Sequence, residues 1–251
     1  MKNTIYEDLK KIELGLIEAG KIACGFAPKD MGTAIKPDKT IVTQADLAVD
    51  KVLKEILPTN NEGWLSEETV DDIVRLKKKR VWVVDPIDGT IEFASGIPQW
   101  AISIGLIEEG IPIAGGVYNP MRNQLILGAL GEGVTLNGKK ARISVKKKIY
   151  NGKFSVSNSE YMKGQWDKFR KLPIDFVVCG STAYKIARVA AGIDDASFSF
   201  TSKKEWDIAA GFCLINAAGG VALDINGNAI CFNQSNTKHH GYVVGPKEVV
   251  N

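Results

Sequence analysis

An apolar stretch of the chain runs directly into a group of oxygen-bearing side chains. Residues 80–84 read RVWVV, which predicts a buried strand, and residues 85–90 follow as DPIDGT. The proline is expected to end the strand and Gly89 to permit a tight turn. Carboxylates, carbonyls and a hydroxyl at a strand end are the ligands that Mg²⁺ and Ca²⁺ prefer. A helix beginning at Gly89 and Thr90 would present backbone N–H groups to a phosphate, whereas an ordinary surface turn is the simpler alternative.

Two further acidic positions lie beside apolar residues elsewhere in the chain. Glu67 belongs to a Ser-Glu-Glu run after a Trp-Leu pair, and Asp207 lies in the first turn of the helix predicted from EWDIAAG. Taken alone, Glu67 is better explained as part of an exposed acidic turn. Asp207 is explained equally well as an acid that the helix dipole favours near an N-terminus. Neither position indicates a site by itself.

In combination, these segments resemble the inositol monophosphatase family. SEE, then DPIDGT, then WD opening a helix of small residues occur in the family's order, and VTQAD upstream matches as well. The similarity covers nearly the whole chain. This family of lithium-sensitive, magnesium-dependent phosphatases includes fructose-1,6-bisphosphatases and 3′(2′),5′-bisphosphate nucleotidases. The resemblance therefore implies a phosphoric monoester hydrolase with two or three Mg²⁺ ions in each site.

The resemblance also implies which side chains hold these ions. Glu67, Asp85 and the carbonyl of Ile87 would bind the first ion. Asp85, Asp88 and Asp207 would bind the second, so that Asp85 bridges the two, and Glu67 would help to hold a third. Independently of the family, a phosphate ester needs its charge neutralised and a water activated, and metal ions do both. The all-oxygen ligand set favours Mg²⁺ over Zn²⁺.

Further roles follow from the same resemblance. Thr90 and Asp46 would orient and deprotonate the attacking water, with Glu67 as a third catalytic residue, and Lys36 would lie in a loop over the site. The residues expected to contact the substrate, a small phosphorylated metabolite, are Ile87, Asp88, Gly89, Thr90, Ser181, Thr182, Lys185 and Asp207.

The identity of the substrate is less defined. Inositol phosphatases of the family commonly carry an acid seven positions before the WD aspartate, and this chain has Phe200 there. The EWDIAAG run and Lys185 resemble bisphosphate nucleotidases, whereas PQWAISIGL resembles inositol phosphatases. Lys203 and Lys204 would bind a second phosphate or belong to a solvated loop. The alternatives are a nucleotidase acting on 3′-phosphoadenosine 5′-phosphate and a non-catalytic, metal-binding relative. Retention of every expected metal ligand argues against the second.

Two subdomains are expected to position these residues. Apolar periodicity predicts helices from Thr4 towards Pro28 and from Thr43 to Pro58, followed by strands over 80–84, 100–107, 111–118, 124–129 and 133–136. Strands over 154–156, 175–179, 196–200 and 221–224 then alternate with helices over 159–169, 182–191 and 205–218. The expected fold is an α+β and α/β chain arranged as an alternating α-β-α-β-α sandwich, with subdomains 1–148 and 149–251 and the metal site between them.

Composition narrows the class of protein. The 251 residues carry 32 Lys and Arg against 29 Asp and Glu, and this near-balance argues against a nucleic-acid partner. The chain has no apolar run of membrane-spanning length and no leader-like start, so no membrane partner is expected. The four cysteines form no CxxC pair and are expected to be small, buried hydrophobic residues. A cytoplasmic enzyme is expected, and the family resemblance adds a homodimer.

Overall fold

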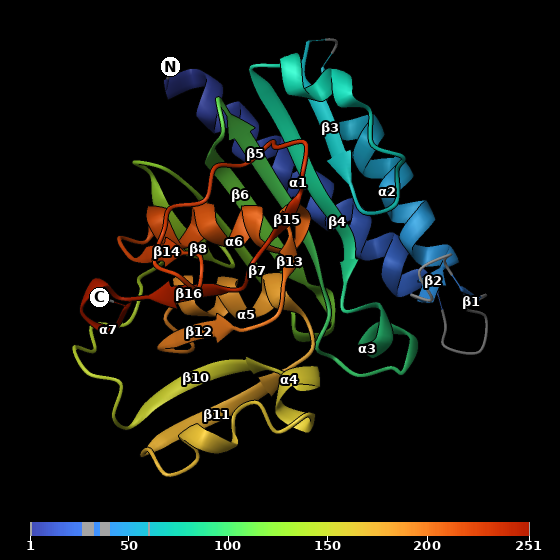
Figure 1. Ribbon diagram of the computed structural model, residues 1–251. Coiled ribbons are helices and arrows are strands. Elements are labelled where there is room, and N and C mark those ends of the chain that lie inside the picture. Colours follow the sequence, from blue (N-terminus) through green and yellow to red (C-terminus); the bar gives the residue numbers. More distant parts are fainter. Residues whose placement is uncertain (1, 27–32, 36–40, 60, 251) are drawn as a thin grey trace.

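Two β-sheets separate three layers of helices, so the chain forms the expected five-layer sandwich (Figure 1). The structure is a computed structural model that describes residues 2–26, 33–35, 41–59 and 61–250. Its helices are α1 (Lys2–Gly25), α2 (Gln44–Ile56), α3 (Thr90–Ala94), α4 (Asn158–Met162), α5 (Thr182–Ala190), α6 (Glu205–Ala217) and α7 (Lys247–Val250), with 3₁₀ turns η2 (Ile73–Lys77), η3 (Pro120–Arg122) and η4 (Asp167–Phe169).

The larger sheet has seven strands in the order β3-β4-β5-β6-β7-β8-β9. Its strands are β3 (Gly63–Ser66), β4 (Arg80–Asp88), β5 (Ala101–Glu108), β6 (Ile111–Asn119), β7 (Gln124–Ala129), β8 (Gly133–Leu136) and β9 (Lys139–Ala141). β3 runs parallel to β4, and every later neighbour pairs antiparallel. Short connections suffice for such a meander, which explains the turn residues between its strands.

The smaller sheet has five strands in the order β11-β10-β12-β16-β14. They are β10 (Gly152–Ser157), β11 (Ile174–Cys179), β12 (Ala196–Ser199), β14 (Val221–Leu223) and β16 (Tyr242–Gly245). β10 pairs parallel with β11 and β12, whereas β16 pairs antiparallel with β12 and β14. Two short pairs lie outside these sheets, namely β1 (Thr33–Ile35) with β2 (Ile41–Thr43) and β13 (Lys203–Lys204) with β15 (Lys238–His239).

The middle helical layer joins the two halves of the chain. α1 and α2 cover the outer face of the larger sheet, and α5 and α6 fill the space between the sheets (Figure 1). Small residues bring α6 close to the larger sheet: a Cβ placed on Gly105 of β5 would lie 3.0 Å from the backbone N of Ala210. One hydrophobic cluster therefore combines residues from both halves, such as Val117 and Leu214.

Several predictions are wrong in detail. Cys179 and Cys213 are buried as expected, whereas Cys24 and Cys231 are exposed. β4 continues past residue 84 to Asp88 instead of ending at the proline. The helix predicted over 159–169 is broken, because Gly164 adopts a positive φ of 71° between α4 and η4. The chain leaves the larger sheet at Ala141 and enters the smaller one at Gly152, and the boundary of subdomains 1–148 and 149–251 stays a prediction. Within the described residues, no helix is long and apolar enough to cross a membrane.

Candidate active site

A β-bulge places the two aspartates of the DPIDGT segment on the same side of β4. In the pairing with β5, Asp85 lies opposite Ser103 and Asp88 opposite Ala101, so β4 uses one more residue than its partner between these points. Side chains alternate along a regular strand, and residues three apart would face opposite ways. The extra residue restores a common direction. The bulge also tolerates Pro86, which has no N–H to give to the ladder.

Asp207 joins these two carboxylates from the other half of the chain. It lies in the first turn of α6, where its Oδ2 accepts a hydrogen bond from the backbone N of Lys204 at 2.8 Å. One carboxylate oxygen from each of Asp85, Asp88 and Asp207 lies within 4.8 Å of the other two. Three of the predicted metal ligands are thus brought together from β4 and from the N-terminus of α6.

The electrostatics of this cluster fit a divalent cation. Asp85 is only 1% exposed, and its Oδ1 is buried without a hydrogen-bond partner. Burial, followed by the charges of Glu67, Asp88 and Asp207, raises the pKa of Asp85 well above its ordinary value. Burial and then the charge of Asp88 raise the pKa of Asp207 to about 7. A hard cation bound here would give the orphaned oxygen a partner and neutralise the mutual repulsion.

Glu67 and Asp46 lie near enough for their charges to act on Asp85. Asp46 is a buried residue in the first turn of α2, and Glu67 directly follows β3, with its backbone N donating to Val84 O at 3.3 Å. Sequence reasoning missed Asp50, one turn after Asp46. Its carboxylate accepts hydrogen bonds from the hydroxyls of Ser66 and Thr69 and so holds the turn that carries Glu67. The signal was present in the i, i+4 spacing of the two aspartates.

Gly89 and Thr90 begin α3 immediately after the bulge. Gly89 has a φ of 97°, which L-residues rarely adopt, and a Cβ there would lie 3.2 Å from Gln99 O. The Thr90 hydroxyl donates to Ile87 O at 3.1 Å, which places the predicted carbonyl ligand and the predicted catalytic hydroxyl side by side. The backbone therefore makes a sharp turn at Gly89, directly after the carboxylate cluster on β4.

The segment before α5 contacts the cluster from the other side. Asp88 Oδ2 accepts hydrogen bonds from Ser181 Oγ at 2.6 Å and from the backbone N of Ala183 at 2.5 Å. Thr182 is the first residue of α5 and is buried beside them. Lys185 is also buried, and its ammonium donates to main-chain carbonyls of the same segment. Direct contact of Lys185 with a substrate is therefore not what this arrangement favours.

Comparison with known proteins decides the family. The model of the inositol monophosphatase family matches residues 6–249. The chain belongs to the inositol monophosphatase family. Inositol monophosphatase 2 of Saccharomyces cerevisiae is 30% identical over 247 residues, which cover 90% of this chain and 82% of the yeast protein. Nus factor SuhB of Pasteurella multocida is 31% identical over 217 residues, covering 82% of this chain and 80% of that protein.

A solved structure agrees with this assignment. The extragenic suppressor protein SuhB of Bartonella henselae matches with a TM-score of 0.83 at 25% identity, and the match covers 96% of this chain and 94% of that one. Inositol monophosphatase family members are phosphoric monoester hydrolases and use divalent metal ions. The cluster of Asp85, Asp88 and Asp207 supplies suitable ligands for such ions in this phosphatase.

Phe200, Lys203 and Lys204 precede Asp207 and bear on the choice of substrate by this phosphatase. The ring of Phe200 lies 5.1 Å from that of Trp166 and belongs to an aromatic cluster on the smaller sheet, so it does not stand free as a pocket wall. Lys203 Nζ donates to Thr201 Oγ1 at 2.9 Å, and its charge lowers the pKa values of Asp88 and Asp207 against the effect of burial. Lys204 instead lies over the Trp206 ring and donates to Thr237 Oγ1 at 3.4 Å. Of these two lysines, Lys203 is thus the one whose charge acts on the carboxylate cluster.

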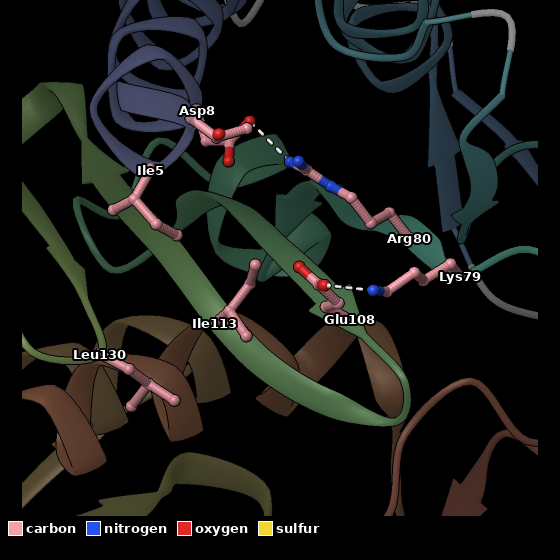
Figure 2. Close-up of a pocket in the computed structure, with 8 residues that line it drawn as sticks. Ile5, Asp8, Lys79, Arg80, Glu108, Ile113 and Leu130 are labelled. Atoms are coloured by element: carbon pink, nitrogen blue, oxygen red, sulfur yellow. Dashed lines mark hydrogen bonds and ion pairs between the residues drawn. The ribbon is translucent and has the colours of Figure 1, made fainter. Parts of the chain in front are cut away.

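A cavity of about 460 Å³ lies at the end of β4 that is opposite to the carboxylate cluster (Figure 2). Its charged residues pair with one another: Arg80 contacts Asp8 at 2.6 Å, and Lys79 contacts Glu108 at 3.2 Å. β4 begins at Arg80 and reaches the carboxylate cluster only at its other end, so this cavity is not part of that site. Lys36, predicted to lie over the site, falls outside the described residues.

Proposed function

We propose that this chain hydrolyses small phosphate monoesters, among them inositol-1-phosphate, with Mg²⁺ as its divalent ion. The observation that carries the proposal is the cluster of Asp85, Asp88 and Asp207, in which an orphaned oxygen and raised pKa values call for cations. In the family pattern Glu67 and the carbonyl of Ile87 complete the ligand set for two or three ions. A non-catalytic relative would be expected to have lost some of these groups.

The protein's own groups have distinct tasks in this proposal. Bound divalent ions supply neutralisation of the phosphate charge and activation of the attacking water. The backbone N–H groups of Gly89 and Thr90 hold the phosphate, and the turn at Gly89 fixes their direction. The Thr90 hydroxyl and the Asp46 carboxylate orient the attacking water, and Asp46 takes its proton.

The substrate range is proposed to be broad. The acid that many inositol phosphatases carry before the WD aspartate is replaced by Phe200, whose ring is packed against Trp166. A site that hydrogen-bonds a substrate hydroxyl rejects analogues lacking that hydroxyl strongly, and a site without such a group discriminates less. A nucleotidase acting on 3′-phosphoadenosine 5′-phosphate is the second candidate, because Lys203 adds a cation beside the cluster.

A substrate panel tests this proposal. The purified protein is assayed with Mg²⁺ and inositol-1-phosphate, fructose-1,6-bisphosphate and 3′-phosphoadenosine 5′-phosphate, and kcat/KM is compared. Release of phosphate from all three, with values within about 100-fold or 2.7 kcal/mol of one another, is expected. A larger preference for one ester contradicts broad specificity, and no Mg²⁺-dependent release from any ester contradicts the proposed activity.

Lithium inhibition belongs to the same proposal and has its own test. The family resemblance implies that Li⁺ replaces one divalent ion at Asp85, Asp88 and Asp207 after the ester is cleaved. Turnover at saturating substrate and Mg²⁺ is expected to fall in a Li⁺ titration and to stay unchanged with K⁺ at equal ionic strength. Equal responses to Li⁺ and K⁺ would count against lithium binding at this cluster.

A further inference from the structure

A buried cation near the active site has no place in the mechanism above. Lys185 is 0% exposed and lies in the first turns of α5. Its Nζ donates to the carbonyl oxygens of Cys179 at 3.1 Å, Gly180 at 3.1 Å and Ser181 at 2.9 Å. Buried lysines normally pair with carboxylates, and cations are disfavoured near a helix N-terminus. A residue that breaks both tendencies indicates a local function.

The segment that Lys185 holds is the one that contacts Asp88. The carbonyls of residues 179–181 converge on the ammonium, whereas the donors of the same segment face the N-terminal half of the chain. Two of these donors, Ser181 Oγ and the backbone N of Ala183, meet on Asp88 Oδ2 at 2.6 and 2.5 Å. The backbone N of Ser181 donates to Gln99 O at 3.1 Å. Lys185 therefore binds the carbonyl groups of a segment whose hydrogen-bond donors bind Asp88.

Neighbouring side chains restrain the position of the 179–183 segment. A Cβ on Gly180 would lie between 2.0 and 2.5 Å from the carboxyl group of Glu92, so a larger residue there would displace that carboxyl group. Gln99 Oε1 accepts a hydrogen bond from the backbone N of Gly180 at 3.3 Å, and Gln99 Nε2 donates to Val178 O at the same distance. With Glu92 and Gln99 on one side and Lys185 on the other, removing the ammonium leaves three converging carbonyls without their shared donor.

We propose that Lys185 is a positioning residue, which holds the 179–183 segment so that both of its donors bind Oδ2 of Asp88 and the Oδ1 oxygen is left to ligate a divalent ion. The inference rests on the proposed function only in assigning that ion to Asp88. Groups that orient a metal ligand through hydrogen bonds typically change metal affinity by about 10–100-fold when they are removed. Lys185 would act one step further out, through Ser181 and Ala183.

Mg²⁺ binding without substrate tests the proposal. The apparent Kd for Mg²⁺ is taken from the dependence of Tm on Mg²⁺ concentration, for wild type, Lys185→Met and a matched control, Arg188→Met. Arg188 lies on the same helix and pairs with Asp194 at 2.7 Å, away from Asp88. Both variants are expected to lower the Tm of the metal-free protein. Only Lys185→Met is expected to weaken Mg²⁺ binding, by about tenfold or more, and an unchanged Kd overturns the proposal.

Two further variants keep the proposal testable if Lys185→Met does not fold. Ser181→Ala removes one donor from Asp88 and is expected to weaken Mg²⁺ binding several-fold. Ser181 Oγ also caps α5 by accepting from the backbone N of Tyr184 at 3.0 Å, so the metal-free Tm is expected to fall as well. Lys185→Gln restores two N–H donors without the charge and is expected to recover Mg²⁺ affinity relative to Lys185→Met. A Ser181→Ala protein with wild-type Mg²⁺ affinity, or a Lys185→Gln protein that recovers none, contradicts positioning through this segment.

The result also separates this inference from the proposed function. If wild type binds Mg²⁺ but releases no phosphate from any ester, the proposed activity fails while the role of Lys185 is still decided by the Kd values. If wild type is an active phosphatase and Lys185→Met binds Mg²⁺ normally, only the inference fails. If wild type binds no Mg²⁺, both are wrong.

Discussion

Single residues at the site are held in positions that they would avoid in water. Asp85, Asp88 and Asp207 each offer an oxygen within 4.8 Å of the others, and burial raises the pKa of all three. Neighbouring like charges add to the effect of burial at Asp85 and Asp207. The surrounding fold must therefore supply the free energy that keeps these carboxylates together, and a bound cation returns part of it.

Asp85→Asn is expected to lower kcat/KM at least 100-fold and to leave the fold intact. The amide keeps the shape of the side chain but cannot neutralise the two ions that Asp85 is proposed to bridge, which removes several kcal/mol of transition-state stabilisation. Steady-state kinetics of Mg²⁺-dependent phosphate release measure this loss. Asp175→Asn, an exposed position on β11, is the matched control. Retention of more than about a tenth of wild-type kcat/KM would show that the metal assignment is wrong.

The stability of the metal-free protein is expected to fall as pH rises from about 4 to about 7. The pKa of Asp207 is raised from 3.8 to about 7, so the folded state binds the proton more tightly than the unfolded state. A raised carboxyl pKa therefore stabilises the fold below 3.8, and this contribution is lost by the time the pH exceeds about 7. Melting temperatures of wild type and Asp207→Asn, measured in chelator across this range, give the contribution.

The pH and the presence of Mg²⁺ decide whether wild type or Asp207→Asn has the higher melting temperature. At pH 8 without metal, Asp207→Asn is expected to melt above wild type, because the amide carries no charge to repel Asp88. At pH 4 the two are expected to melt together. Saturating Mg²⁺ at pH 8 is expected to reverse the order, since the amide is a poorer ligand. A metal-free wild type that is as stable as the variant at pH 8 would refute the electrostatic account.

The chemistry-bearing residues could be predicted from the sequence, but their supporting contacts could not. Glu67, Asp85 and Asp207 stood out because carboxylates beside apolar residues and glycine form a recognisable order. The spacing of Asp50 from Asp46 and the resemblance at Lys185 drew attention to these positions, but their roles depend on which hydroxyls and carbonyls the fold brings to them. Contacts between residues far apart in sequence are decided by tertiary packing, which local pattern does not encode.

At the scale of elements, the bulge in β4 is the feature that makes the site. The proline in DPIDGT was expected to end the strand, and the structure instead continues β4 to Asp88 with one extra residue. Local propensity ranks a proline as a strand terminator, whereas a bulge leaves its missing N–H without consequence. The sequence predicted most of the larger sheet's meander and the helices around it. Within the two sheets it missed β3, β9 and β16, whose runs are short.

Gly89→Ala is expected to destabilise the protein more than Gly96→Ala and to reduce phosphatase activity. Both glycines have positive φ values, 97° and 70°, so both substitutions incur backbone strain of roughly 1–2 kcal/mol. Only at Gly89 would the new Cβ also crowd Gln99 O at 3.2 Å, whereas nothing lies within 4 Å of a Cβ at Gly96. Urea unfolding measures the stability difference. Equal losses of stability and activity in the two variants would show that the turn at Gly89 has no special role.

At the scale of the whole molecule, the site exists only because two halves of the chain meet. β4 contributes Asp85 and Asp88, α6 contributes Asp207, and the start of α5 closes on Asp88 (Figure 1). The middle layer of helices packs against both sheets, so any change in their separation would alter the distance between the carboxylates. The segment that leads into α6 carries Lys203 and Lys204, and we expect substrate groups beyond the phosphate to contact it.

Lys203→Ala is expected to alter substrate preference, whereas Lys204→Ala is not. Lys203 acts electrostatically on Asp88 and Asp207, so its ammonium is placed to meet a second anionic group of a substrate. Lys204 is exposed and lies over Trp206, 5.4 Å from the ring centroid, which makes it the matched control for loss of a lysine. The quantity to measure is kcat/KM for 3′-phosphoadenosine 5′-phosphate divided by kcat/KM for inositol-1-phosphate.

A charge-assisted hydrogen bond to a second phosphate contributes about 1.5–3 kcal/mol, so Lys203→Ala is expected to lower this ratio by about tenfold or more. Because inositol-1-phosphate has a single phosphate, its own kcat/KM should change much less. Lys204→Ala is expected to leave the ratio within about twofold of wild type, a change below 0.5 kcal/mol. An unchanged ratio in Lys203→Ala would return that lysine to a solvated loop, and equal falls in both variants would mean that the net charge of the loop, rather than the position of Lys203, attracts the second phosphate.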